Sequence, residues 1–231
     1  MERLGDAFTA LHAWLFASLM QPAMYALGLM SYVEDAYGAT EVFLYGVLEI
    51  ALLFALFRPL EALWPVEAWR DRRALNVDIL YTLLNRLGFL PLLIFLLLRP
   101  LVDGVDGFLR LHDVIPPNLE DLIPGLAQHP LAAFLVYVLV LDLAQYLRHR
   151  LQHRYDWWWA LHSLHHSQRQ LSFWADNRNH LLDDLIADLW LVLVALLIGV
   201  PSGQFIAILV LMRMVESLSH ANTRVGFGWL G

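Results

Sequence analysis

Five histidines fall within eighteen residues of this 231-residue chain, directly after an apolar stretch. They are His149, His153, His162, His165 and His166. Imidazole is the commonest protein metal ligand and binds metals in its neutral form. His149 and His153 stand four residues apart, and the other three stand at i, i+3 and i+4, so on helices each set would project from one face. The cluster therefore predicts a metal site.

The number and type of these residues narrow the kind of site. The run from His149 to His153 has the spacing of a zinc-protease helix, but position 150 is Arg where that mechanism needs Glu as the general base. Five ligands exceed what one haem or one tetrahedral zinc uses, which indicates two ions close together. Nitrogen ligands suit iron, zinc or copper, and the sequence does not rank these metals. The chain has no cysteine, which excludes thiolate and iron–sulfur sites.

Polar residues near the cluster are candidates for supporting roles. Asp142 and Tyr146 precede His149 on one helical stripe, where a carboxylate could accept a hydrogen bond from the second ring N–H of a ligand histidine. Glu216 lies one turn before His220 at the end of an apolar stretch, where an ionisable group is costly without a partner. We therefore predict Asp142, Tyr146 and Glu216 as supporting residues and His220 as a ligand.

Two further groups of histidines are assigned by position. His180 is a candidate ligand, because it would share a helix face with three acidic residues, Asp176, Asp183 and Asp184. Three others are expected to lie away from the metal site: His12, His112 and His129.

The composition predicts a membrane protein. Hydrophobic residues make up 59% of the chain and charged residues 16%, against about 25% charged in soluble domains. All fifteen basic residues are Arg, and the net charge of −7 disfavours binding to nucleic acid. We expect an all-α integral membrane bundle, read as a single domain over residues 1–231.

A membrane-spanning helix needs roughly 20 mostly apolar residues. Four segments meet this requirement: 9–33, 41–60, 76–98 and 130–147. A further apolar tract at 185–218 is interrupted by Pro201-Ser-Gly203, so we expect there a helical hairpin that enters and returns, or two tilted spans. The prediction is therefore about four transmembrane helices plus a hairpin.

The arginine distribution predicts the orientation of the bundle. Segments 58–75 and 148–184 are rich in Arg, including Arg70, whereas the loop expected at 99–129 is rich in acidic residues. Because cytoplasmic loops carry the excess of positive charge, the histidine-rich cap is expected on the cytoplasmic side, in a bacterial inner membrane. The three tryptophans at 157–159 would then form an aromatic belt at the membrane surface.

With these residues in place, the sequence resembles the fatty acid hydroxylase/sterol desaturase superfamily. The matching positions run from Asp142 to His166, as Tyr146, then His149-Arg150 and His153, then Trp159, then His162 and His165-His166-Ser167. The pattern HxxxH followed by HxxHH after a transmembrane helix is specific to that group. Ser219-His220-Ala221-Asn222 is similar to its third histidine region, and the likeness covers roughly residues 40–225.

The resemblance implies an integral-membrane, non-haem oxygenase with two iron ions, although zinc could occupy the site in a preparation. Such enzymes use O₂ and electrons from a separate donor protein to hydroxylate or desaturate a fatty acyl chain or sterol. It also implies that His149, His153, His162, His165, His166 and, more loosely, His220 are ligands.

The chain departs from the family pattern at its end, where a further HxxHH group is expected and the sequence stops at Gly231. We therefore expect this domain to lack its C-terminal histidine motif.

Alternative functions are a metal-binding membrane protein without catalysis and a membrane haem protein. A transporter should place ionisable residues near the membrane midplane of several helices. It is disfavoured, because there the spans 9–33 and 41–60 offer only His12 and Glu49.

Overall fold

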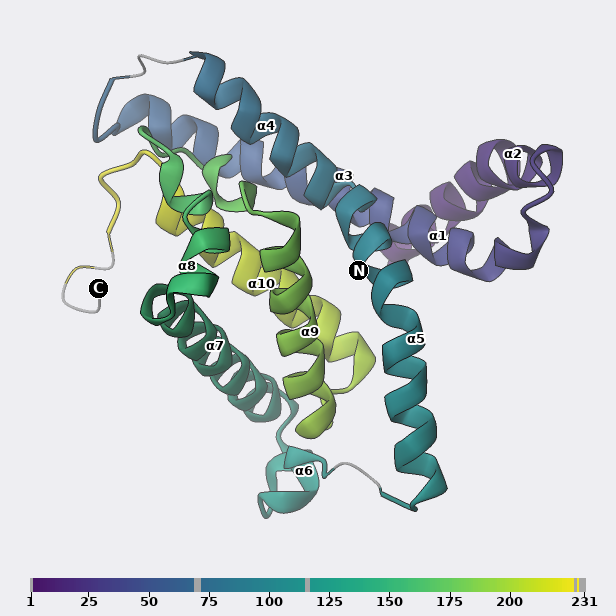
Figure 1. Ribbon diagram of the computed structural model, residues 1–231. Helices are drawn as coiled ribbons and strands as arrows, with labels where there is room; N and C mark the ends of the chain where they lie inside the picture. The colour runs from purple at the N-terminus through teal and green to yellow at the C-terminus, as the bar shows by residue number, and fades with distance from the viewer. Residues whose placement is uncertain (1, 69–71, 115–116, 227, 229–231) are drawn as a thin grey trace.

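The structure is a computed structural model that describes residues 2–68, 72–114, 117–226 and 228. The described residues form helices and no strands, which confirms the all-α prediction (Figure 1). Arg70 lies outside the described residues. The helices are α1 (Glu2–Leu15), α2 (Gln21–Ala26), α3 (Val33–Leu63), α4 (Arg72–Arg86), α5 (Phe89–Leu111), α6 (Leu119–Leu122), α7 (Pro130–Arg154), α8 (Asp156–His162), α9 (Leu181–Leu197) and α10 (Ser202–His220).

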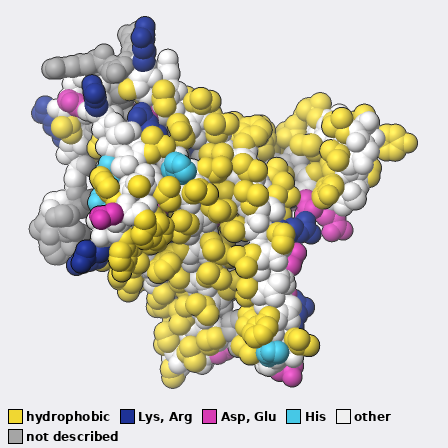
Figure 2. Space-filling view, viewed as in Figure 1, with side chains coloured by type: hydrophobic (Ala, Val, Ile, Leu, Met, Phe, Trp, Pro, Cys, Tyr) yellow, Lys and Arg dark blue, Asp and Glu magenta, His cyan; other side chains and the backbone are white. Residues whose placement is uncertain are grey.

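Two of the expected spans lie within single long helices. Segment 41–60 falls inside α3 and segment 130–147 inside α7. Among the described residues, Met30–Leu63 and Pro130–Arg154 are long and apolar enough to cross a membrane, and a third span results if the bent pair α4–α5 counts as one. Hydrophobic side chains cover most of the face in Figure 2, as expected for a chain that meets lipid.

The other two expected spans are not continuous helices. Within 9–33, the first helical stretch ends at Ala26 and the chain turns at Gly28, whose φ is +69°. Within 76–98, α4 ends at Arg86 and α5 begins at Phe89, with a bend of 49° between them. Gly88, at φ +85°, makes this break, because only glycine adopts the left-handed conformation without steric cost.

The expected acidic loop at 99–129 is also partly helical, because α5 continues to Leu111. Arg99 on α5 is held to Asp35 at 2.8 Å, which joins this helix to the start of α3. The expected hairpin at 185–218 is present as α9 and α10, which a break around Gly199 and Pro201 separates.

One hydrophobic cluster joins α7 to the hairpin. Its buried members are Leu126, Ala133, Tyr137, Leu141, Leu191, Ala195 and Ile208. Trp190 Nε1 also donates to the carbonyl of Ala144 at 3.0 Å, which fixes α9 against α7. This packing brings the C-terminal ends of α7 and α10 and the N-terminal end of α9 close to the histidine-rich segment.

A second contact region places the connection after α3 beside the end of α10. Asn222 Oδ1 accepts from the backbone N–H groups of Val66 and Glu67, both at 3.1 Å. Gln170 Nε2 donates to the carbonyl of Ala68 at 2.8 Å. The two Arg-rich segments of the sequence therefore meet at one end of the bundle, and the connection between α5 and α7 lies at the other end (Figure 1).

Candidate metal centre

The first two histidines of the cluster lie on the last two turns of α7. His149 and His153 are one helical turn apart, and the distance between their Nε2 atoms is 3.1 Å. The chain leaves the helix at Tyr155, in an extended conformation, and α8 starts directly after it. The chain reverses direction at Tyr155, so α8 packs against the C-terminal end of α7.

The second set of histidines does not share one helix, which corrects the expectation from spacing. α8 ends at His162, and His165 and His166 lie in the 3₁₀ turn His165–Ser167. His166 Nε2 lies 3.2 Å from His162 Nε2, whereas His165 faces His220. The end of α8 at His162 therefore separates these histidines: His162 and His166 stay together, and His165 pairs with His220.

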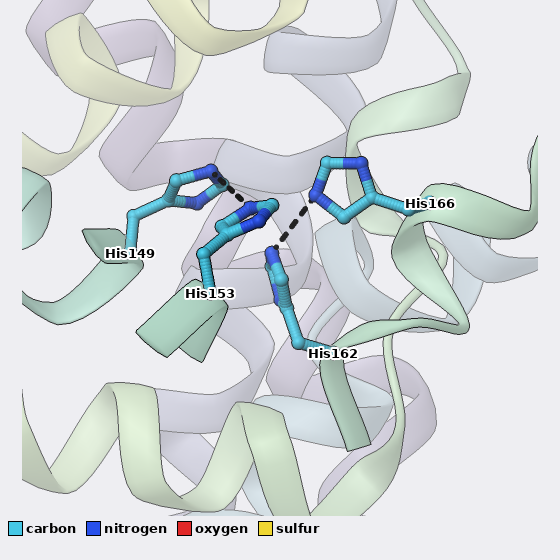
Figure 3. Close-up of side chains that lie close together, drawn as sticks. All are labelled: His149, His153, His162 and His166. Carbon is cyan, nitrogen blue, oxygen red and sulfur yellow. Dashed lines mark hydrogen bonds between the residues drawn. The ribbon is translucent and has the colours of Figure 1, made fainter. Parts of the chain in front are cut away.

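Four imidazoles converge on one point, as Figure 3 shows: His149, His153, His162 and His166. Their candidate ligand atoms all lie within 4.8 Å of one another. Metal–imidazole bonds are about 2.0–2.1 Å, so ligands on opposite sides of one ion lie about 4.2 Å apart. The four side chains thus fit a single transition-metal ion after small adjustments.

Asp183, which the sequence analysis did not predict for this role, orients one of these ligands. Its Oδ2 accepts from His162 Nδ1 at 2.9 Å, and its Oδ1 accepts from Gln152 Nε2 at 2.7 Å and Trp158 Nε1 at 2.9 Å. Burial alone would raise the pKa of Asp183, but these hydrogen bonds outweigh it and lower that pKa. The ionised carboxylate keeps the proton of His162 on Nδ1 and leaves Nε2 free for metal.

One feature of the sequence could have indicated the role of Asp183. Asp183 and Asp184 begin the apolar helix α9, and carboxylates buried in such a helix need partners. The actual partners of Asp183 are 21 to 31 residues away in sequence. Trp158 is also buried, at 6% exposure, and so does not join the expected aromatic belt.

His165 and His220 form a second pair beside the four-histidine group. Their Nε2 atoms lie 3.1 Å apart, and His220 Nδ1 donates to the main-chain carbonyl of Glu216 at 2.9 Å. The ring of His165 is 5.3 Å from that of His162, centroid to centroid. His165 Nδ1 is buried without a hydrogen-bond partner. The pair therefore places two more imidazoles beside the four-histidine group.

Burial lowers the pKa of two of the clustered histidines, His165 and His166. It lowers the pKa of His165 to about 3, with a further contribution from His220 and then His162. Burial likewise lowers the pKa of His166. Both rings are therefore neutral at physiological pH, as ligation requires.

Three predicted residues lie elsewhere than expected. His180 lies outside the four-histidine group and its Nδ1 accepts from Leu182 N at 3.2 Å, because α9 begins at Leu181 and this ring caps it. The Tyr146 hydroxyl oxygen accepts a hydrogen bond from Arg150 Nη1 at 3.0 Å. Asp142 lines a cavity of about 580 Å³ next to the histidines, and among the described residues neither it nor Tyr146 forms a hydrogen bond with a clustered histidine. Glu216 supports His220 through its main chain.

A buried ion network holds α10 in place. Arg86 on α4 contacts Glu49 on α3, Asp176 at 2.6 Å and Ser217 of α10 at 3.0 Å. The backbones of α3 and α4 approach each other closely at Gly46. A Cβ at this position would collide with the carbonyl oxygen of Arg86, so the approach requires glycine. This network fixes the helix that carries His220.

Comparison with known families gives one match, over residues 134–231, to Fatty acid hydroxylase. This segment contains all six clustered histidines and Asp183. Residues 134–231 are therefore similar to the fatty acid hydroxylase family. The match confirms the resemblance to the fatty acid hydroxylase/sterol desaturase superfamily. No curated protein and no solved structure matches the chain.

The likeness of this segment to the fatty acid hydroxylase family indicates the general chemistry. The family implies an oxidoreductase that uses O₂ and a lipid substrate, and it is known for using iron. Together with the apolar helices, it indicates an integral membrane protein. The four convergent imidazoles are a metal-binding group consistent with this family.

Proposed function

We propose that this chain is a membrane-bound enzyme that hydroxylates or desaturates a lipid with O₂ at a histidine-held di-iron centre. The observation that carries the proposal is the convergence of four imidazoles inside the segment that matches the family. His149, His153, His162 and His166 would hold one ion, and His165 and His220 would contribute to the second. The iron centre would supply the oxidising power that breaks an unactivated C–H bond, which side-chain acids and bases cannot do.

The protein itself positions the imidazoles and sets which ring nitrogen carries the proton. Asp183 holds the proton on Nδ1 of His162, and the Glu216 carbonyl holds the proton on Nδ1 of His220, so both Nε2 atoms stay available. The cavity next to the histidines offers a site for the lipid beside the metal. We place the histidine-rich end on the cytoplasmic side, where a separate electron-donor protein would reach it.

The first test is metal content. Protein purified from cells supplied with iron should hold at least one tightly bound ion per chain, by inductively coupled plasma mass spectrometry. His162→Ala should remove this ion, because it deletes both a ligand and the partner of Asp183. His112→Ala is the matched control, because His112 lies against Phe108 at the far end of α5. Equal metal content in both variants would refute the ligand assignment.

The second test is the reaction. Lipid extracts of cells with and without the protein should differ by products that gain one oxygen or lose two hydrogens, detected by mass spectrometry. His162→Ala should abolish these products. A protein that binds iron yet yields neither product with a competent electron donor would be a metal-binding protein without catalysis, the alternative function.

A further inference from the structure

Two tryptophans of α8, Trp157 and Trp158, are stacked on each other between the surface and the four-histidine group. Their ring centroids are 5.1 Å apart, and their planes differ by 11°. Trp157 is 58% exposed, whereas Trp158 is 6% exposed. The stack therefore leads from the surface of the protein to the buried side of α8.

Hydrogen bonds connect Trp158 to one of the clustered histidines. Its Nε1 donates to Asp183 Oδ1 at 2.9 Å, and the other carboxylate oxygen, Oδ2, accepts from His162 Nδ1 at 2.9 Å. His162 Nε2 lies beside His166 in the four-histidine group. One ring stack and two hydrogen bonds thus form an unbroken connection between the exposed Trp157 ring and a candidate metal ligand.

A structural role accounts for only the inner part of this connection. The hydrogen bonds from Trp158 and Gln152 hold the Asp183 carboxylate in place, and they do not require a second ring on the outer face of Trp158. Electrons tunnel more readily through stacked rings and hydrogen bonds than across van der Waals gaps. An exposed ring stacked on a buried one is therefore suited to electron transfer toward the histidines.

The surface beside Trp157 carries positive charge. Arg150 and Arg154 are both exposed and lie one helical turn apart near the end of α7, and Arg154 is three residues before Trp157. Within the described chain, no ion pair joins either arginine to a carboxylate. Asp156 is the one acidic residue from position 143 to position 175. Because complementary charges steer and orient association, this surface favours an acidic partner.

We propose that a reduced electron-carrier protein with an acidic surface docks over Trp157. Its electron then passes to Trp158 and, through Asp183, to His162. The carrier loses one electron, a ferric ion held by His162 gains it, and the tryptophans and Asp183 keep their protons. The inference rests on the proposed function, to which it adds the place where electrons enter and the charge of the partner.

The first experiment measures docking to the full chain, as purified, in phosphatidylcholine nanodiscs. The probes are two acidic carriers, a [2Fe–2S] ferredoxin and a soluble b-type cytochrome, and one basic c-type cytochrome. At least one acidic carrier should bind, and the basic one should not. Trp157→Ala should weaken this binding about thirtyfold, the usual effect of truncating a central aromatic residue of an interface. Arg154→Gln should also weaken it and reduce its dependence on salt, because salt screens the attraction between charges.

The matched control for docking is Trp14→Ala. Trp14 is also a tryptophan and is 60% exposed, but it lies on α1, far from α8 (Figure 1). This variant should bind the acidic carrier with wild-type affinity. The comparison therefore separates docking over Trp157 from a general effect of removing an exposed aromatic side chain.

The second experiment measures electron entry in iron-loaded protein, with the oxidation state of the iron as the readout. Freeze-quench Mössbauer spectroscopy follows reduction of the iron by saturating carrier without O₂. Trp157→Ala should slow this step because it removes the outer ring, and Trp158→Phe because it removes the N–H that donates to Asp183. Trp157→Tyr should restore much of the rate, because it returns an exposed ring. Reduction by dithionite, which needs no docking, should be equally fast in wild type and Trp157→Ala.

Four results would overturn the inference. Neither acidic carrier binds the wild type, or Trp157→Ala binds and accepts electrons as Trp14→Ala does. Alternatively, Trp157→Ala and Trp158→Phe, both with wild-type iron content, are reduced by saturating carrier at the wild-type rate. In the fourth, Trp157→Cys reacts only with a thiol reagent dissolved in the membrane, which would make this position a lipid anchor.

The two proposals fail in different ways. Wild-type protein that accepts electrons through Trp157 but yields no oxidised lipid would refute the proposed function and leave this inference standing. Oxidised lipid from wild type, together with unchanged docking and reduction in Trp157→Ala, would refute this inference and leave the proposed function standing.

Discussion

His162 Nδ1 donates to Asp183 Oδ2 at 2.9 Å, and both side chains are buried. Because an ionised carboxylate only accepts hydrogen bonds, this contact fixes which ring nitrogen carries the proton. The same carboxylate holds Gln152 and Trp158, so it also ties α9 to α7 and α8. A residue outside the four-histidine group thus determines the protonation pattern of one of its members.

Asp183→Asn should weaken metal binding about 10–100-fold, because loss of such a partner loosens the ligand and lowers its basicity. The amide has nearly the same size, so the fold should be retained. Affinity is measured by competition with a chromophoric chelator. The control is Asp113→Asn, at an exposed position after α5, which should keep the wild-type affinity for metal. An unchanged affinity in Asp183→Asn would contradict the role of Asp183.

Replacing Arg86 should destabilise the whole domain. Arg86→Met leaves Glu49 and Asp176 buried without their cation, and breaking such a pair costs about 3–5 kcal/mol. The free energy of unfolding is measured in detergent micelles with a chemical denaturant. Arg110→Met breaks an exposed pair with Asp106 and should have little effect. Similar stability of the two variants would show that the buried network is dispensable.

The stability of the metal-free protein should depend on pH through His165. The folded chain keeps this ring neutral down to about pH 3, whereas the unfolded chain protonates it below about 6.5. Unfolding is therefore favoured as the pH falls from about 6.5 to 3, by up to about 1.4 kcal/mol per pH unit. His165→Gln should remove this contribution.

The measurement is the difference in unfolding free energy between wild type and His165→Gln at a series of pH values. Using the difference cancels other groups, including Asp184, whose raised pKa acts in the opposite direction: its contribution to stability is present at low pH and is lost as the pH rises through about 7. Parallel pH profiles for the two proteins would mean that His165 is not held neutral by the fold.

The arrangement of the helices predicts which residues share a side of the membrane. Because Ala68 contacts Gln170, we expect Ala68 and Asp156 on one side, and Asp106 on the other. The chain has no cysteine, so single Cys substitutions at these positions can be labelled with an impermeant thiol reagent. Labelling of all three after permeabilisation is the control. Finding positions 106 and 156 on the same side would refute this topology.

Local spacing in the sequence was sufficient to predict several features. The long apolar segments around 41–60 and 130–147 are helical, and His149 and His153 meet because the helical period brings residues four apart to one face. These relationships depend on backbone geometry within one element. They could therefore be predicted without knowledge of the rest of the chain.

The division of the histidines was decided by tertiary structure. His165 and His166 are adjacent in sequence, yet His166 joins His162 while His165 meets His220, 55 residues away. Asp183 reaches His162 because α9 packs against α7 and α8, and Arg86 reaches Asp176 because α4 packs against the turn Ala175–Asn177. Such partners are set by the packing of separate helices against one another, which the pattern within any one segment does not encode.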